Sequence, residues 1–459
     1  MGVFGKFTTK RKSVKDVNSY AQLEEGAPMK QAYAPTKPVV PIATELADDD
    51  EPTIFTTFMV LYLGFFGLTL LFYPYIHAAD ASPWNPAAYW TTISPSTAFA
   101  FRIAGGGFLT LILGPFLDEI FGGVGVLMKA FTRQCLIVNF IAFFLFLYFS
   151  FYAPLDDAIP FIWKGQTIFA GFVLAWSIIE AIPLQYLPGS YVLFNVLMYS
   201  GFGVGLTAIP DLAFGPPSPV AYWNEWGPLD VLTGRSLGLS LLILITLGAV
   251  YASGPGYCKQ VTAFNLINLG LFVIPAFYGG ASAVTSMWLI QFVFTVPIVL
   301  VGIYLELVGA TGTWAPAFSC PACGLNVESF NMFNLFFYLP FAAGFLSPYA
   351  NLMFGPNTPT GFPMFNQEFG ETALWFTKAW ATCVLLLTLG PYLFSLSPVK
   401  TAKQMALAYI VFTGLFIYTL VTTDLFNMVM MGPLTGLNVV LAIVGVYVSA
   451  NSSEGLLSA

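Results

Sequence analysis

The sequence predicts an all-α polytopic membrane protein with about twelve transmembrane helices, built as three tandem four-helix repeats. Hydrophobic residues make up 57% of the chain and charged residues only 8%, whereas soluble domains carry roughly 25% charged residues. Apolar stretches recur from residue 54 to the C-terminus, each close to the roughly 20 residues that a helix needs to cross a bilayer. The phrase Pro-x-x-Pro-x-x-aromatic occurs three times at corresponding places among these stretches, which indicates an internal repeat.

The N-terminal segment, residues 1–52, differs from the rest of the chain. It has few large apolar side chains, so we expect little intrinsic structure, and its acidic end covers residues 48–51. Its basic cluster consists of Lys6, Lys10, Arg11, Lys12 and Lys15. A basic segment beside a membrane attracts anionic lipid head groups; the alternative is that it only sets the topology.

The predicted spans follow the three repeats in order. In the first repeat, residues 53–188, they are 54–76, 97–117, 134–153 and 166–186. In the second, residues 189–325, they are 191–210, 235–253, 260–280 and 286–308. In the third, residues 326–459, they are 329–348, 373–395, 404–422 and 426–449. The repeats would surround a pseudo-threefold axis or lie in a row, and the sequence leaves both arrangements open.

Basic residues predict the orientation, because lysine and arginine are retained on the cytoplasmic side. Seven lie in the N-terminal segment. Five more lie between the second and third spans of the repeats: Lys129, Arg133, Lys259, Lys400 and Lys403. We therefore expect both termini in the cytoplasm and the proline-rich loops on the opposite side; which membrane holds the protein is left open.

The proline phrase ends on an aromatic residue in each repeat: Tyr89, Tyr222 and Phe362. Proline fixes the backbone torsion and stiffens these loops. We interpret the loops as structural caps over the bundle, with a recognition surface for an outside partner as the alternative. A second recurring signature is a basic residue followed by Gln134, Gln260 or Gln404 at the start of each third span.

One cation enters the second span of each repeat: Arg102, Arg235 and Lys378. A charge inside a membrane helix is costly and is often functional. These three side chains are candidate substrate-binding residues that would form a cationic ring attracting an anion. The alternative is that each side chain snorkels to the head groups, although we expect Lys378 to lie deeper than the two arginines.

Four neutral amides complete the candidate substrate-binding set: Asn139, Asn265, Gln166 and Gln291. We expect a transporter or channel for a small solute with its path between the repeats, in which case these amides converge on a common cavity; the alternative is a non-transporting subunit. If they make separate hydrogen bonds between helices, the protein is a structural or accessory membrane subunit that binds lipids and partner proteins. Glycine-rich positions favour close helix packing in either case.

Other classes of function find little support in the sequence. Cys320 and Cys323 have a spacing seen in redox and zinc motifs, but the single histidine, His77, is predicted on the opposite face, so we expect no metal site. No phosphate-binding loop or nucleophile–base pair stands out, and we expect neither an enzyme nor a bound cofactor. The net charge of −7 argues against nucleic-acid binding.

Overall fold

The computed structural model describes residues 53–82, 85, 88–121, 126–151, 157–218, 220–251, 254–278, 285, 287–311, 324–359 and 362–452. Over these ranges the secondary structure is helical, with three isolated β-bridges in the loops. The predicted N-terminal segment and the Cys320–Cys323 motif lie outside the described residues.

The helices fall into three groups, which we call the N-terminal, middle and C-terminal groups. The N-terminal group contains α1 (Ile54–Phe72), η4 (Pro74–His77), α2 (Pro95–Phe121), α3 (Val126–Phe151) and α4 (Pro160–Ala181). The middle group contains α5 (Leu187–Ala208), α6 (Pro210–Phe214), α7 (Pro228–Leu241), η5 (Leu242–Leu247), α8 (Gly248–Tyr251), α9 (Pro255–Tyr278) and α10 (Met287–Leu307). The C-terminal group contains α11 (Val327–Leu346), α12 (Ala350–Phe354), α13 (Glu371–Thr388), α14 (Gly390–Leu393), α15 (Pro398–Thr422) and α16 (Met428–Ala450).

Nine helices in the described ranges are long and apolar enough to cross a membrane, so the chain is a multi-pass membrane protein by length and composition. They are α1, α3, α4, α5, the continuous segment from α7 to α8, α10, α11, α15 and α16. The three other predicted spans coincide with α2, α9 and α13, which are helical but are not among the nine. The count of twelve spans therefore stays a prediction.

Local sequence explains where several helices begin. Proline is the first residue of α2, α4, α7, α9 and α15, and its fixed torsion and missing N–H suit the first turn of a helix. Two other helices have side-chain caps: Asn326 Oδ1 accepts from the amide of Ser329 at 2.8 Å, and Asn427 Oδ1 accepts from the amide of Val429 at 3.1 Å. These caps satisfy amides that the first turn leaves without partners.

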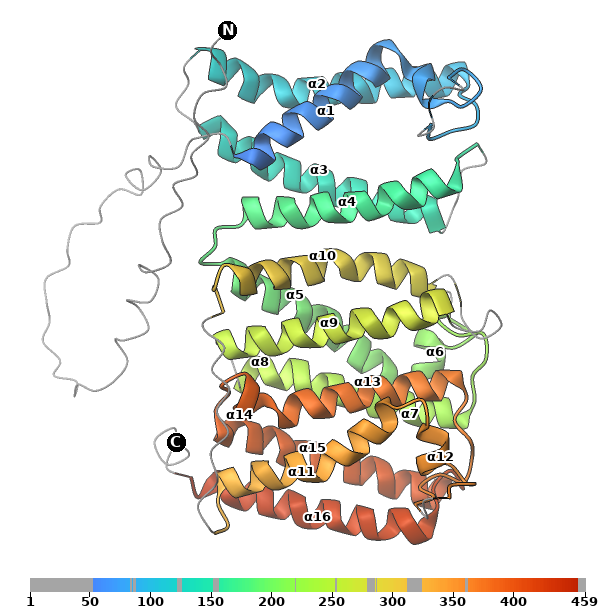
Figure 1. Cartoon of the computed structure of the whole chain (residues 1–459), viewed down its shortest axis with the longest axis vertical. Helices are drawn as coiled ribbons and strands as arrows, with labels where there is room; N and C mark the ends of the chain where they lie inside the picture. Colours follow the sequence, from blue (N-terminus) through green and yellow to red (C-terminus); the bar gives the residue numbers. More distant parts are fainter. Residues whose placement is uncertain are drawn as a thin grey trace, which may run out of the picture.

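The three groups lie in a row, with the N-terminal group at one end and the C-terminal group at the other (Figure 1). Within each group the first long helix packs on the second and the third on the fourth, as in α1 with α2 and α3 with α4. The middle group meets the N-terminal group mainly through α10 on α4, and it meets the C-terminal group mainly through α7 on α13. Of the two arrangements that the sequence left open, this is the row.

Small residues allow the first two helices of a group to approach closely. A Cβ on Gly105 of α2 would lie 2.7 Å from the carbonyl oxygen of Gly67 in α1. A Cβ on Gly238 of α7 would lie at the same distance from the carbonyl oxygen of Gly203 in α5. Both pairs are backbone-to-backbone contacts that a larger residue would prevent.

Candidate functional site

The proline-rich loop of the N-terminal group is held by two side chains of α4. The indole Nε1 of Trp163 donates to the carbonyl oxygen of Tyr89 at 2.9 Å. The Tyr89 hydroxyl donates to Gln166 Oε1, and Gln166 Nε2 donates to the Tyr62 hydroxyl of α1, both at 2.9 Å. We call this arrangement of tryptophan, tyrosine and glutamine the tyrosine clamp.

The middle group repeats the tyrosine clamp. Trp288 Nε1 donates to the carbonyl oxygen of Tyr222 at 2.9 Å, and the Tyr222 hydroxyl donates to Gln291 Oε1 at 2.7 Å. Gln291 Nε2 donates to Thr295 Oγ1 at 3.3 Å within α10. Gln166 and Gln291 therefore hold loops onto their own groups.

The C-terminal group keeps the backbone pattern of this loop without the clamp. In all three groups a backbone amide just before the fourth long helix donates to a carbonyl oxygen of the loop. In the two outer groups this bond runs from Ile159 to Tyr89 at 2.9 Å and from Asn427 to Met364 at 3.0 Å. Met364 is thus the counterpart of Tyr89. The sequence phrase instead matched Phe362, which is 53% exposed, so the aromatic position of the third phrase was placed two residues too early.

Asn139 bridges helices inside the N-terminal group. Its Nδ2 lies 2.6 Å from Ser177 Oγ in α4 and 3.7 Å from the sulfur of Met59 in α1. The side chain is buried. It links three helices, since Asn139 itself lies in α3.

Asn265 lies at the centre of a larger network in the middle group. Its Nδ2 donates to the Tyr191 hydroxyl at 2.8 Å and to Asn195 Oδ1 at 2.7 Å. Its Oδ1 accepts from the Tyr199 hydroxyl at 2.6 Å. Asn265 has no exposed surface, so the amide joins α9 to α5 and has every polar atom paired.

The four candidate amides therefore make separate hydrogen bonds inside two different groups. Gln166 and Asn139 have their partners within the N-terminal group, and Gln291 and Asn265 have theirs within the middle group. No hydrogen bond between the described residues connects the two pairs. Asn139, Asn265 and Gln166 thus bond to other helices, whereas Gln291 bonds to a loop and to its own helix.

The three cations occupy the same position on their helices. Arg102, Arg235 and Lys378 each lie seven residues after the first residue of α2, α7 or α13, which is about 10 Å along the axis. The three cations thus lie equally far along their helices, and a greater depth of Lys378 in the membrane stays a prediction. Arg102 is exposed, and the other two are half-buried.

The row arrangement does not bring these three cations around one axis. Helix α2 makes its main contacts with α1, α3 and η4, whereas α7 and α13 pack on each other. In Figure 1, α2 lies at the end of the row opposite to the C-terminal group. The ring inferred from sequence is thus not formed within one chain, and anion binding by the individual cations stays a prediction.

His77 packs its ring against α1 and against Tyr89, the aromatic residue of the first proline phrase. Its side chain is 4% exposed, its Nε2 is 3.1 Å from Thr69 Oγ1, and its ring stacks on Phe66. Burial lowers the pKa of His77 from its ordinary value of 6.5, so the neutral form is favoured. Within the described ranges no three His, Cys, Asp or Glu side chains are grouped to hold a metal ion.

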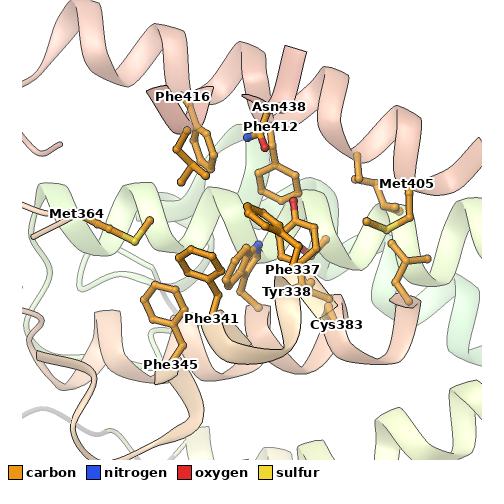
Figure 2. Close-up of a pocket in the computed structure, with 17 residues that line it drawn as sticks. Phe337, Tyr338, Phe341, Phe345, Met364, Cys383, Met405, Phe412, Phe416 and Asn438 are labelled. Carbon is orange, nitrogen blue, oxygen red and sulfur yellow. The ribbon is translucent and has the colours of Figure 1, made fainter. Parts of the chain in front are cut away.

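Two apolar cavities, one mainly in the middle group and one mainly in the C-terminal group, were not predicted from the sequence. The cavity of the middle group is lined by Tyr222, Trp288 and Gln291 of the clamp together with residues of α5, α7, α9 and α13. The C-terminal cavity lies among α11, α13, α15 and α16, with Ser240 and Ile243 of the middle group also lining it, and is rich in aromatic side chains (Figure 2). Its polar residues include Asn438, an amide inside an otherwise apolar span, which is the one sequence signal that could have drawn attention to it.

The chain matches no known protein family, and neither a curated protein nor a solved structure is detectably similar to it.

Proposed function

We propose that the protein is a non-transporting structural or accessory membrane protein that binds lipids and partner membrane proteins. The observation that carries this proposal is the pairing of the four amides: each bridges elements of its own group, so none is available to line a shared polar path. Asn265 is the strongest case, because three hydrogen bonds to α5 occupy its amide. Buried polar residues in membrane proteins commonly join helices in this way.

We further propose that the chain consists of three tandem four-helix repeats with twelve spans. Contacts between the middle and C-terminal groups support this architecture, because they are reciprocal. Gln260 Nε2 donates to the carbonyl oxygen of Leu386 at 2.7 Å, and Gln404 Nε2 donates to that of Ile243 at 3.2 Å. Leu386 and Ile243 each lie eight residues after the cation of their helix, so equivalent residues exchange equivalent bonds.

The predicted topology completes the proposal. Both termini would face the cytoplasm, where the basic N-terminal segment would contact anionic lipid, and the three proline-rich loops would cap the opposite side. The tyrosine clamp supports a structural role for these loops, because it fixes the loop aromatic to α4 or α10. We propose no enzymatic activity, cofactor or nucleic-acid partner.

Reconstitution into sealed vesicles tests the proposal directly. Purified full-length protein in vesicles of phosphatidylcholine and phosphatidylglycerol should give no flux of chloride, nitrate or small neutral solutes above that of protein-free vesicles. The Lys378→Met variant should behave like the unsubstituted protein. Protein-dependent flux that falls in this variant would instead establish transport and assign Lys378 to the path.

A further inference from the structure

The cavity of the C-terminal group has the lining of a lipid site. Its volume is about 70 Å³, enough for a few water-sized groups, and its open mouth allows a longer molecule to extend out of it. Figure 2 shows the rings of Phe337, Tyr338, Phe341 and Phe345 from α11 on one side and Phe412 from α15 on another. None of the described residues that line it is charged, so the cavity suits a neutral, mostly apolar molecule.

Two polar groups of this cavity have no partner among the described residues. Asn438 is only 3% exposed, yet its amide forms no hydrogen bond with any described residue. The indole Nε1 of Trp380, which also lines the cavity, is buried without an acceptor among the described residues. Most buried polar groups are hydrogen-bonded, and an unpaired one costs free energy. Two such groups in one cavity indicate that something other than this part of the chain pairs with them.

The corresponding cavity of the middle group provides an internal comparison. There, Gln291 and Trp288 are both bonded to Tyr222. The position equivalent to Asn438 is Thr295, which is also paired. In the middle group the clamp thus pairs the glutamine and an indole of the cavity within the protein.

We propose that the C-terminal cavity binds a neutral membrane lipid carrying one hydroxyl or carbonyl oxygen. The apolar part would lie against the aromatic rings, and the oxygen would accept a hydrogen bond from Trp380 Nε1. The Asn438 amide can donate to that oxygen or accept from its hydroxyl hydrogen. A charged head group is disfavoured, because the cavity offers no counter-charge. This inference goes beyond the proposed accessory role and does not depend on the absence of transport.

Photolabelling distinguishes this proposal from simple immersion in lipid. The probes are hexadecanol with a mid-chain diazirine and the matching hexadecane that lacks the hydroxyl, each added to full-length protein in phosphatidylcholine nanodiscs. Mass spectrometry locates the labelled peptides. We expect saturable labelling of α13 and α16 by the alcohol, competed by unlabelled hexadecanol, and only weak, non-saturable labelling by the alkane.

Three variants test the polar contacts. Asn438→Leu and Trp380→Phe each remove one hydrogen-bonding group while keeping the apolar bulk, and each should weaken the apparent affinity for the alcohol about three- to tenfold. Thr295→Val, the matched change in the middle group, should leave this labelling unchanged. Asn438→Leu should also maintain or raise the thermal stability of lipid-depleted protein, because it removes an unpaired buried amide.

Three results would overturn the proposal. The first is equal labelling by alcohol and alkane, and the second is alcohol labelling that both variants leave unchanged. The third is a density map in native lipid that shows only an isolated water molecule between Trp380 and Asn438. An elongated density that reaches both side chains would support the proposal.

Discussion

Replacing Asn265 by leucine should destabilise the middle group strongly. The substitution keeps the side-chain volume approximately but removes three hydrogen bonds, to Tyr191, Asn195 and Tyr199. Hydrogen bonds between membrane helices average about 0.6 kcal/mol and reach about 1.7 kcal/mol. Because three partners lose their bonds together at a site with no exposed surface, we expect a loss of about 2–4 kcal/mol in the free energy of unfolding.

The matched control is Asn139→Leu, at the equivalent position of the N-terminal group. Asn139 has one short bond to Ser177 and one long contact to a sulfur, so its loss should cost about 1 kcal/mol. Reversible unfolding in mixed micelles of dodecyl maltoside and dodecyl sulfate measures both values. A change below about 0.5 kcal/mol for Asn265→Leu would refute a bridging role and return this amide to the candidates for a polar path.

Three further changes test packing, protonation and the contact between groups. Gly238→Ala should cost about 1–3 kcal/mol of unfolding free energy by overpacking, since its Cβ would meet backbone atoms. The control Gly106→Ala has open space and should change the unfolding free energy by no more than about 0.5 kcal/mol. Similar losses for the two variants in micelle unfolding would contradict the close contact at Gly238. Because burial lowers the pKa of His77 below 6.5, the unfolded state binds more protons just below that pH, so stability should be full above about pH 6.5 and fall as the pH decreases. His77→Gln should weaken that pH dependence, and an unchanged melting profile from pH 7.5 to 5 would argue against it. Gln260→Leu and Gln404→Leu should each cost about 0.5–1.5 kcal/mol in the same unfolding assay, and unequal losses would speak against reciprocal contacts.

Composition and apolar length predicted the helical membrane class because both are properties of the sequence itself. Every predicted span overlaps a helix, and prolines and small polar caps account for many of the boundaries. The partners of Asn139 and Gln166 could not be predicted in the same way. Ser177 and Tyr62 lie on other helices, and a single sequence carries no signal for which side chains meet across them.

The third proline phrase shows a different limit of sequence reasoning. A fixed spacing aligned Phe362 with Tyr89. The loop differs in length among the groups, however, when it is counted from the carbonyl that accepts a hydrogen bond from the amide at the tyrosine position. That carbonyl belongs to His77 in the first loop and to Phe354 in the third. Loops tolerate such changes in length, so the hydrogen bonds, rather than the spacing, identify Met364 as the equivalent residue.

The C-terminal group differs from the other two in two respects that belong together. Met364 takes the place of the tyrosine, and Met431 and Leu434 lie as far after Asn427 as Trp163 and Gln166 lie after Ile159, so the clamp residues are missing. Its cavity contains the buried Nε1 of Trp380, which has no partner among the described residues, and the amide of Asn438, which makes no hydrogen bond to them. A clamp satisfies polar groups internally and leaves a ligand nothing to bind. Loss of the clamp alone would yield an apolar cavity with no specificity, whereas unpaired donors alone would only destabilise the fold. A lipid site requires both features in one group. The chain thus has two groups whose loops are held by clamps and a third group whose cavity is able to hold a ligand.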